Sequence, residues 1–220
     1  MLISLIHPSR GRAKKSFETA TKWIDKAGLK VELIVSCDKS DNELNNYCGK
    51  YFDIIGTNYV WADLIVNDNK SVVEATNRAA EKSKGDILIY TSDDFDCPEN
   101  WGPLVLKEFE GVEGPCLLKV DDCLQPFHVP VLTIPIMNRA LYERLGYFWH
   151  PEYKSMFCDT DLFEVCKKNN WLKFAPHLKF PHNHVSVGKA QDDETYRRSA
   201  ANWDQGKALF ARRKAQGFPI

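Results

Sequence analysis

A short apolar run that ends in acidic residues, Gly85 to Asp96, constrains the fold more than any other stretch of this chain. Ile87 to Tyr90 is rich in β-formers and carries no charge, which is typical of a strand buried on both faces of a parallel sheet. Asp93, Asp94 and Asp96 follow within four positions. The stretch therefore predicts an α/β protein with carboxylates at the carboxyl end of a strand, where open α/β sheets bind ligands.

Carboxylates this close together repel one another unless a cation lies between them. Hard oxygen ligands suit Mg²⁺ or Mn²⁺, and these ions take their remaining oxygens from water and substrate phosphates. The alternative is an acidic, solvated turn, because Asp is common in turns for its own backbone hydrogen bonds. The acidic stretch alone does not choose between the two.

Composition limits the classes of protein that the chain can belong to. Its 220 residues, 44% of them apolar, suffice for one large domain or two fused halves. Because 29 basic residues stand against 30 acidic ones, no general attraction to nucleic acid or to an anionic membrane is expected. No apolar run approaches transmembrane length and no signal core is present, which indicates a cytoplasmic protein. Seven cysteines without paired spacing fit buried thiols better than disulfides or a zinc site.

The first part of the chain predicts a β-α-β unit. Leu2 to Ile6 is an apolar strand, residues 17–27 place apolar side chains at helical spacing before Gly28, and Val31 to Ser36 is a second strand. Asp38 follows that strand. A carboxylate at this place commonly accepts hydrogen bonds from the base or ribose of a nucleotide, and the alternative is a helix cap or turn.

The segment before the acidic strand is less regular. We expect a short helix and two short strands here, at Asn42–Tyr51, Asp53–Gly56 and Asp63–Val66. Ser71 and Glu74 form a capping box that opens a helix ending near Lys84. Lys70 and Arg78 lie at the same sheet edge as the acids and are candidate partners for phosphate, with solvated side chains as the alternative.

After Asp96 the pattern predicts three further elements before a loop. These are a helix that has Pro98 in its first turn and continues to Phe109, a strand at Val131–Ile136, and a helix at Asn138–Leu145. The loop is rich in aromatic residues from Tyr147 to Phe157, which suits stacking on sugars or bases but equally suits packing. Asp159 then lies at or just before a helix start, where capping is the plain alternative to catalysis.

Two histidines near the end of the chain are candidate metal ligands. His182 and His184 are two residues apart, so in an extended segment both point to the same side. With Asp94 they form a plausible ligand set. The tail from Asp193 to Gln216 predicts a charged, weakly amphipathic helix that packs across the domain.

The order of these features resembles the GT-A glycosyltransferases, specifically the large family 2 type. The elements that carry the resemblance are Pro8 with Arg10 to Arg12, Asp38, Asn77, Gly85-Asp86, Ser92-Asp93-Asp94, Cys158-Asp159-Thr160-Asp161-Leu162 and His182-Asn183-His184. The acids after the strand resemble the DXD motif of this family. Cys158 departs from the family, which usually has Glu there. The resemblance spans nearly the whole chain, and its specificity comes from the order and spacing of short motifs.

The resemblance implies one GT-A domain over residues 1–220, a Rossmann-like, mixed but mainly parallel sheet flanked by helices. Residues 1–96 would form the nucleotide-sugar-binding half, and residues 97–220 an acceptor half with a C-terminal helix. Metal would bind at Asp94, with His182 or His184 completing its shell. Asp159 would be the catalytic base, with Asp161 as the fallback. The candidate nucleotide-sugar-binding residues are Pro8, Arg10, Arg12, Asp38, Lys70, Asn77, Arg78, Ser92 and Asp93.

The expected activity is a hexosyltransferase reaction that uses Mn²⁺ or Mg²⁺. A nucleoside diphosphate sugar, with a UDP-sugar favoured, would donate its sugar to a hydroxyl of a glycan or other acceptor, with inversion at the anomeric carbon. Asp159 would be kept ionised by the helix start. One alternative is a sugar-phosphate nucleotidyltransferase, although Pro8 to Arg12 lacks the expected glycine-rich, lysine-bearing loop. The other is a non-catalytic carbohydrate- or partner-binding domain, favoured by the absence of Glu before Asp159.

Overall fold

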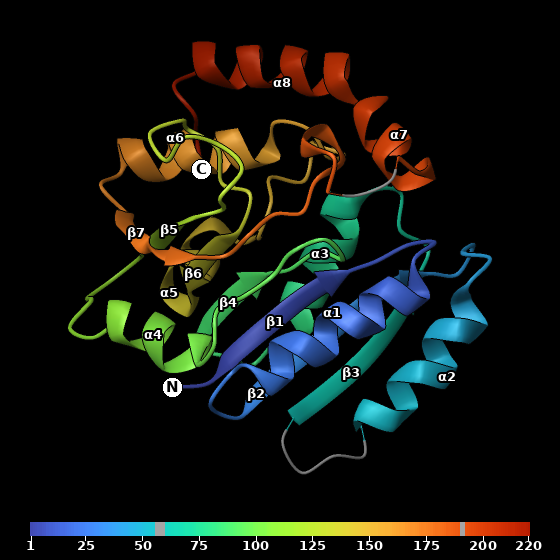
Figure 1. Ribbon diagram of the computed structural model, residues 1–220. Coiled ribbons are helices and arrows are strands. Elements are labelled where there is room, and N and C mark those ends of the chain that lie inside the picture. Colours follow the sequence, from blue (N-terminus) through green and yellow to red (C-terminus); the bar gives the residue numbers. More distant parts are fainter. Residues whose placement is uncertain (56–59, 190–191) are drawn as a thin grey trace.

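A seven-stranded sheet with helices on both faces organises the computed structural model, which describes residues 1–55, 60–189 and 192–220 (Figure 1). The strands are β1 (Ile3–Pro8), β2 (Val31–Asp38), β3 (Val60–Asn67), β4 (Ile87–Tyr90), β5 (Leu117–Asp121), β6 (Pro135–Asn138) and β7 (Leu172–Lys179). Their order is β3-β2-β1-β4-β6-β5-β7. β6 runs antiparallel to both neighbours, and the other pairs are parallel. The expected mixed, mainly parallel sheet is confirmed.

The helices divide between the two faces of the sheet. They are α1 (Ala13–Asp25), α2 (Leu44–Ile55), α3 (Val72–Lys82), α4 (Trp101–Glu108), α5 (Arg139–Leu145), α6 (Cys158–Lys168), α7 (Glu194–Ala200) and α8 (Trp203–Ala215), with a 3-10 turn at Val185–Val187. Side chains of α1, α2 and α4 join one apolar cluster, and those of α3, α5, α6 and α8 join the other. α8 lies over α6, farther from the sheet (Figure 1).

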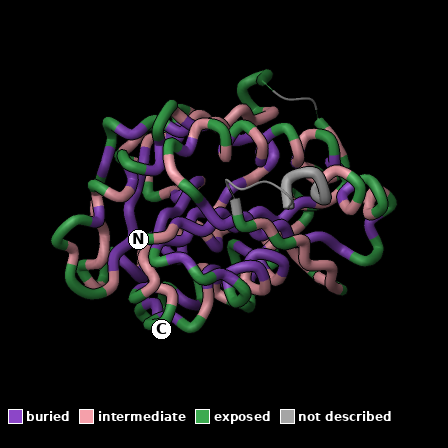
Figure 2. Tube along the Cα trace, turned by 90° about the horizontal axis from the view of Figure 1, so that it is seen from below, coloured by how far each residue is buried: buried purple, intermediate pink, exposed green. Residues whose placement is uncertain are grey.

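Two buried clusters fix the sheet between these helices. Trp23 of α1 is fully buried, with its ring centroid 5.4 Å from those of Trp101 and Phe180. Each such side chain stabilises the fold by about 1.5–3 kcal/mol through burial alone. Figure 2 shows buried strands through the middle of the molecule, with exposed residues on the outer turns. The strands, including their carboxyl ends, are therefore held between two well-packed apolar clusters.

The Gly85-Asp86 pair sets the position of β4 beside β1. A Cβ atom at Gly85 would lie 2.3 Å from Ser4 Oγ, so any side chain there would force the strands apart. The Gly85 amide instead donates to Ser4 Oγ at 2.8 Å. The Leu2 amide donates to Asp86 Oδ2 at 2.7 Å. These contacts precede the parallel register that pairs Ile3 with Ile87.

The capping box predicted from the sequence is present at the start of α3. Ser71 Oγ accepts from the Glu74 amide at 3.1 Å at the start of α3, and Glu74 Oε2 accepts from the Lys70 amide. Asn138 caps α5 by accepting from the Leu141 amide, and Gly146 ends it at φ 76°. These short-range signals were sufficient because each helix end satisfies its own backbone groups locally.

Three element predictions are wrong and one is incomplete. Asp53 to Ile55 belong to α2 and not to a strand, since no proline or glycine interrupts the chain between Lys50 and Ile55; Gly56 lies outside the described residues. Pro98 precedes α4, which starts at Trp101 after Asn100 turns to φ 54°. Residues 131–134 form a loop, because their apolar side chains pack without pairing and β6 starts at Pro135. The predicted single tail helix is divided into α7 and α8.

Across residues 1–55, 60–189 and 192–220, no helix has the combination of length and hydrophobicity that a membrane crossing needs.

Candidate active site

The carboxyl ends of β1, β2 and β4 meet at one edge of the sheet, and the loops that follow them are linked there. The loop after β1 reaches the loop after β2 through the Gly11 amide, which donates to Asp41 Oδ2 at 2.7 Å. The extended segment around His182 returns to this edge, because Phe95 pairs with His182 in an isolated antiparallel bridge. The acidic residues after β4 lie between these segments.

Asp93 is buried and holds the loop after β1. Its Oδ1 is 2.9 Å from His7 Nε2, and its Oδ2 accepts from Ser9 Oγ at 3.0 Å. Arg12 Nη1 lies 4.0 Å from Oδ2. Because both carboxylate oxygens are bound by residues of the first strand and its loop, Asp93 supports the site.

Asp94 faces the C-terminal segment. Tyr196 Oη donates to Asp94 Oδ2 at 2.6 Å, and His182 Nε2 lies 3.2 Å from the same oxygen. Burial by itself raises the pKa of Asp94, but the hydrogen bond and charge of His182 and the hydroxyl of Tyr196 outweigh it and hold that pKa well below its usual range. Asp94 Oδ1 is buried and has no hydrogen-bond partner among the described residues. The site thus presents an ionised carboxylate with an unused oxygen.

His182 and His184 lie together near Asp94. Their ring centroids are 4.9 Å apart, and His182 also packs edge-on against Phe95 at 4.7 Å. Burial, together with the neighbouring His182, lowers the pKa of His184. A neutral imidazole is the form that binds metal.

The donor atoms at this point fit an ion that is only partly held by protein. Within the described ranges there is no group of three or more His, Cys, Asp or Glu side chains that could hold a metal ion. Mg²⁺ and Mn²⁺ do not need such a cage, because they retain water and substrate oxygens. Such an ion would find the unpartnered Oδ1 of Asp94, with His182 at the other oxygen of the same carboxylate and His184 beside His182.

Asp38, the predicted base contact, is mostly buried at the end of β2. Its Oδ2 accepts from Arg10 Nη1 at 2.7 Å, and its Oδ1 accepts from the Asn69 amide at 3.1 Å. Arg78 donates to Asn69 Oδ1 at 3.1 Å and also pairs with Glu74 of the same helix at 2.6 Å. The structure therefore brings Arg10, Asp38 and Arg78 into one polar network.

The remaining candidate donor-binding residues are more scattered in their contacts. Lys70 is exposed, Ser92 is half-buried, and Pro8 is buried at the end of β1. Asn77 supports the aromatic loop: its Oδ1 accepts from the backbone amides of residues 148 and 149, and its Nδ2 donates to a carbonyl of the same loop. Its side-chain oxygen is thus already bound by protein.

Asp159 is the second residue of α6, inside the helix and not at its cap, which is Phe157 at φ 72°. Thr160 Oγ1 lies 3.4 Å from Asp159 Oδ1. Burial raises the pKa of Asp159, and this outweighs the backbone hydrogen bonds at the helix start and the nearby Lys119. Desolvation is therefore a larger effect on this pKa than the helix start.

Asp161, the fallback base, is fully bound by other side chains. Arg213 of α8 makes two contacts with its carboxylate, at 2.6 and 3.2 Å, and Tyr153 Oη donates to it at 3.1 Å. Asp161 and Arg213 are 1% and 3% exposed. This ion pair anchors α8 on α6.

Two residues near the site were missed by sequence reasoning. Lys119 is buried in the middle of β5, where its ammonium donates to the Val129 carbonyl and lies 5.3 Å from the ring centroid of Phe163. A lysine inside an apolar strand was the available signal. Tyr196 carried no such signal, because its contact with Asp94 spans 102 residues of sequence.

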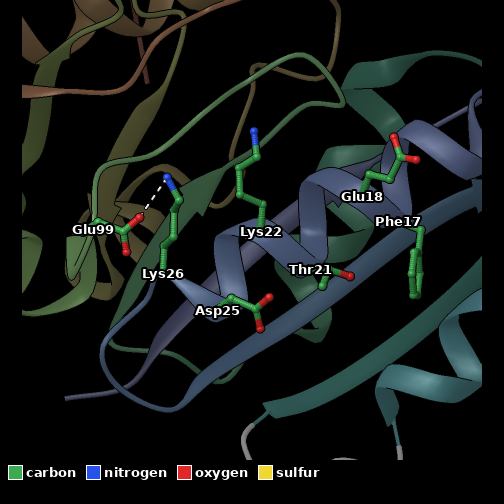
Figure 3. Close-up of a pocket in the computed structure, with 7 residues that line it drawn as sticks. All are labelled: Phe17, Glu18, Thr21, Lys22, Asp25, Lys26 and Glu99. Carbon is green, nitrogen blue, oxygen red and sulfur yellow. Dashed lines mark ion pairs between the residues drawn. The ribbon is translucent and has the colours of Figure 1, made fainter.

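A separate hollow of about 540 Å³ lies along α1 from Phe17 to its C-terminal end (Figure 3). Charged side chains rim it, including Lys22, Lys26 and Glu99, the last two paired at 3.1 Å. None of the candidate site residues lines it. The hollow is therefore no part of the site at the ends of β1, β2 and β4.

Comparison with solved structures places this fold. A mannosyltransferase, PcManGT from Pyrobaculum calidifontis, solved with GDP-Man and Mn²⁺, superposes with a TM-score of 0.65 at 14% identity, over 82% of this chain and 56% of its own. S. aureus TarS 1-349 superposes with a TM-score of 0.62 at 13% identity, over 83% of this chain and 60% of its own. Its complex with UDP-GlcNAc superposes with a TM-score of 0.64 at 14% identity, over 82% of this chain and 58% of its own. The chain has a glycosyltransferase GT-A fold.

The chain spans less than two thirds of the length of each of these structures. No protein-family model matches it, and no curated protein matches it in sequence. The GT-A resemblance seen in the motifs is thus confirmed at the level of the fold.

Proposed function

We propose that the chain is a metal-dependent hexosyltransferase that moves a sugar from a nucleoside diphosphate sugar, with UDP favoured, to a hydroxyl of a glycan or other acceptor. The observation that carries this proposal is Asp94, an ionised, buried carboxylate with an unpartnered oxygen beside two histidines. Structures of the same fold bind UDP-GlcNAc, or GDP-Man with Mn²⁺, which supports the substrate class. We place the protein in the cytoplasm, where nucleotide sugars are made.

On the donor side, Asp94 with His182 or His184 would hold Mn²⁺ or Mg²⁺. Such an ion, when bound, offsets the charge that develops on the diphosphate leaving group. Arg10 and Asp38, which are paired at the end of β2, would contact the nucleoside. The wider donor-binding set remains Pro8, Arg12, Lys70, Asn77, Arg78, Ser92 and Asp93, of which Asp93 acts by holding the loop after β1.

On the acceptor side, we assign Asp159 as the general base. It accepts the proton of the acceptor hydroxyl while that oxygen bonds to the anomeric carbon and the bond to the diphosphate breaks. The raised pKa of Asp159 makes it a stronger base than an exposed carboxylate. One displacement from the face opposite the leaving group inverts the anomeric centre. A double displacement would require a second carboxylate as nucleophile on the donor sugar.

Cys158 bears on the alternative of a non-catalytic binding domain. Its thiol is buried, donates to the Ser155 carbonyl at 2.8 Å, and has a pKa raised well above its usual range by burial. A neutral thiol cannot replace the carboxylate usual at this position. Donor binding without turnover on any acceptor would favour that alternative.

The test separates donor binding from transfer. Nucleotide sugars are screened by thermal shift with and without Mn²⁺, because a ligand that binds the folded state stabilises it by mass action. Asp94→Ala should remove the Mn²⁺-dependent part of the affinity measured by calorimetry. Asp96→Ala is the matched control, since Asp96 pairs with Lys22 at 3.1 Å and with its own neighbouring amide. Equal loss in both variants would contradict the assignment of Asp94.

With a donor in hand, Asp159→Asn tests the base. Donor affinity should survive, whereas transfer should fall by roughly 10² to 10⁴. NMR of the first-formed product reports its anomeric configuration. A product that retains the anomeric configuration of the donor would overturn the mechanism. Transfer by Asp159→Asn at the same rate as the parent would also overturn it.

A further inference from the structure

The segment Asp193–Tyr196, the cap and first turn of α7, binds the loop after β1. The Asp193 carboxylate accepts from Arg12 Nε and Nη2, both at 2.7 Å, in a two-pronged contact. Thr195 Oγ1 donates to the Arg10 carbonyl at 3.1 Å. Paired contacts of this kind are also how Arg binds phosphate.

The same segment binds the acid after β4. Tyr196 Oη donates to Asp94 Oδ2 at 2.6 Å, and its ring packs against Arg12, whose guanidinium lies 4.4 Å from the ring centroid. The His184 ring lies 4.9 Å from the Tyr196 ring. One segment of four residues thus meets both the cation and the acid at this edge of the sheet.

The charges of these contacts match those of the proposed donor complex. Asp193 presents an anion to Arg12, as a diphosphate would. Tyr196 presents the positive end of an O–H bond to Asp94, as a metal ion would. We propose that Asp193–Tyr196 is an internal substitute for the metal diphosphate, and that donor and metal bind by displacing it. This inference rests on the proposed function and adds a built-in competitor to its donor site.

The rest of α7 holds the segment weakly. None of residues 194–200 is buried, and the Arg197–Asp192 ion pair, at 3.2 Å, is exposed. α8, by contrast, is anchored by Leu209 and Arg213. Polar contacts therefore supply most of what holds α7 in place, and α7 can leave without releasing α8.

Binding of Mn²⁺ with UDP as the probe tests the inference. Tyr196→Phe removes the hydroxyl, and Asp193→Asn removes the anion while keeping a capping side chain. Each should tighten binding by about tenfold, which corresponds to about 1.4 kcal/mol, because each removes one charge-assisted contact that competes with the probe. Asp192→Asn, on an exposed carboxylate next in sequence, is the matched control and should bind as the parent does. A melting temperature equal to that of the parent in each of the three variants would show that they fold.

Hydrogen exchange gives a second readout that does not depend on transfer. Adding Mn²⁺ and UDP to the parent should speed exchange of the amides of residues 194–200 and leave those of α8 unchanged. Weaker or unchanged binding in Tyr196→Phe and Asp193→Asn, or slower exchange of α7 with UDP, would overturn the inference while leaving the proposed function intact. Failure of every variant to bind Mn²⁺ and UDP would overturn both.

Discussion

Replacing Asp161 with Asn should unfold the protein far more readily than the same change at Asp159, two residues earlier. Asp161 and Arg213 are 1% and 3% exposed and joined at 2.6 Å, so Asn would leave the guanidinium buried without its counter-charge. Breaking a buried ion pair from one side costs about 3–5 kcal/mol. For a chain of 220 residues, at roughly 2–4 °C per kcal/mol, the melting temperature should fall by about 6–20 °C.

The control variant, Asp159→Asn, should not lower the melting temperature. Because burial raises the pKa of Asp159, the folded protein binds a proton there more tightly than the unfolded chain does. Its stabilising contribution is therefore present at low pH and lost as pH rises through the folded pKa. At neutral pH, Asp159→Asn should leave the melting temperature unchanged or raise it.

Differential scanning calorimetry at pH 7 compares the two variants with the parent. A melting temperature for Asp161→Asn within about 2 °C of the parent would refute the reasoning, since that difference corresponds to under roughly 1 kcal/mol. Asp161→Leu combined with Arg213→Met should recover part of the loss, because both charges are then removed together.

Three further predictions concern residues around the site. Burial and Arg213 lower the pKa of His150, so the stability that this residue confers should be lost as pH falls below 6.5. Between about pH 8 and pH 5.5, the melting temperature of His150→Gln should therefore fall less than that of the parent. Lys119→Met should shift the acid limb of the kcat/KM profile to higher pH, because the Lys119 ammonium lowers the pKa of Asp159, and Lys119→Arg should shift it less. Asn77→Ala should lower the free energy of unfolding in urea by about 1–3 kcal/mol, because the loop amides it binds lose their acceptor. A fall in donor affinity beyond that expected from instability would support the predicted contact of Asn77 with the nucleotide sugar.

The parts of the fold that the sequence predicted are those with local causes. β1, β2 and β4 are short stretches rich in buried apolar residues, and the α3 and α5 ends are set by caps within four residues. β7 is different, because it is an edge strand that buries only Ala175 and Leu178, without strict alternation, and has a proline at position 176. Its pairing with β5 is a tertiary event that no local pattern contains.

The site divides in the same way. The type and order of the candidate residues could be predicted from the sequence, since carboxylates after a buried strand indicate the edge of the sheet at which ligands bind. The pKa of Asp159 was not, because desolvation depends on which segments fold over it. The role of Asp161 depends on Arg213, which lies 52 residues farther along the chain.

Asp93 and Asp94 are neighbours in sequence but belong to different parts of the molecule. Asp93 is bound to His7 and Ser9 at the start of the chain, and Asp94 to His182 and Tyr196 near its end. The two positions therefore have different roles: Asp93 holds the loop after β1, whereas Asp94 is the metal ligand of the proposed function. Under the proposed function, loss of the first acid would act through the fold of the loop after β1, and loss of the second would act through metal binding. A motif scored as a unit would not distinguish these two effects.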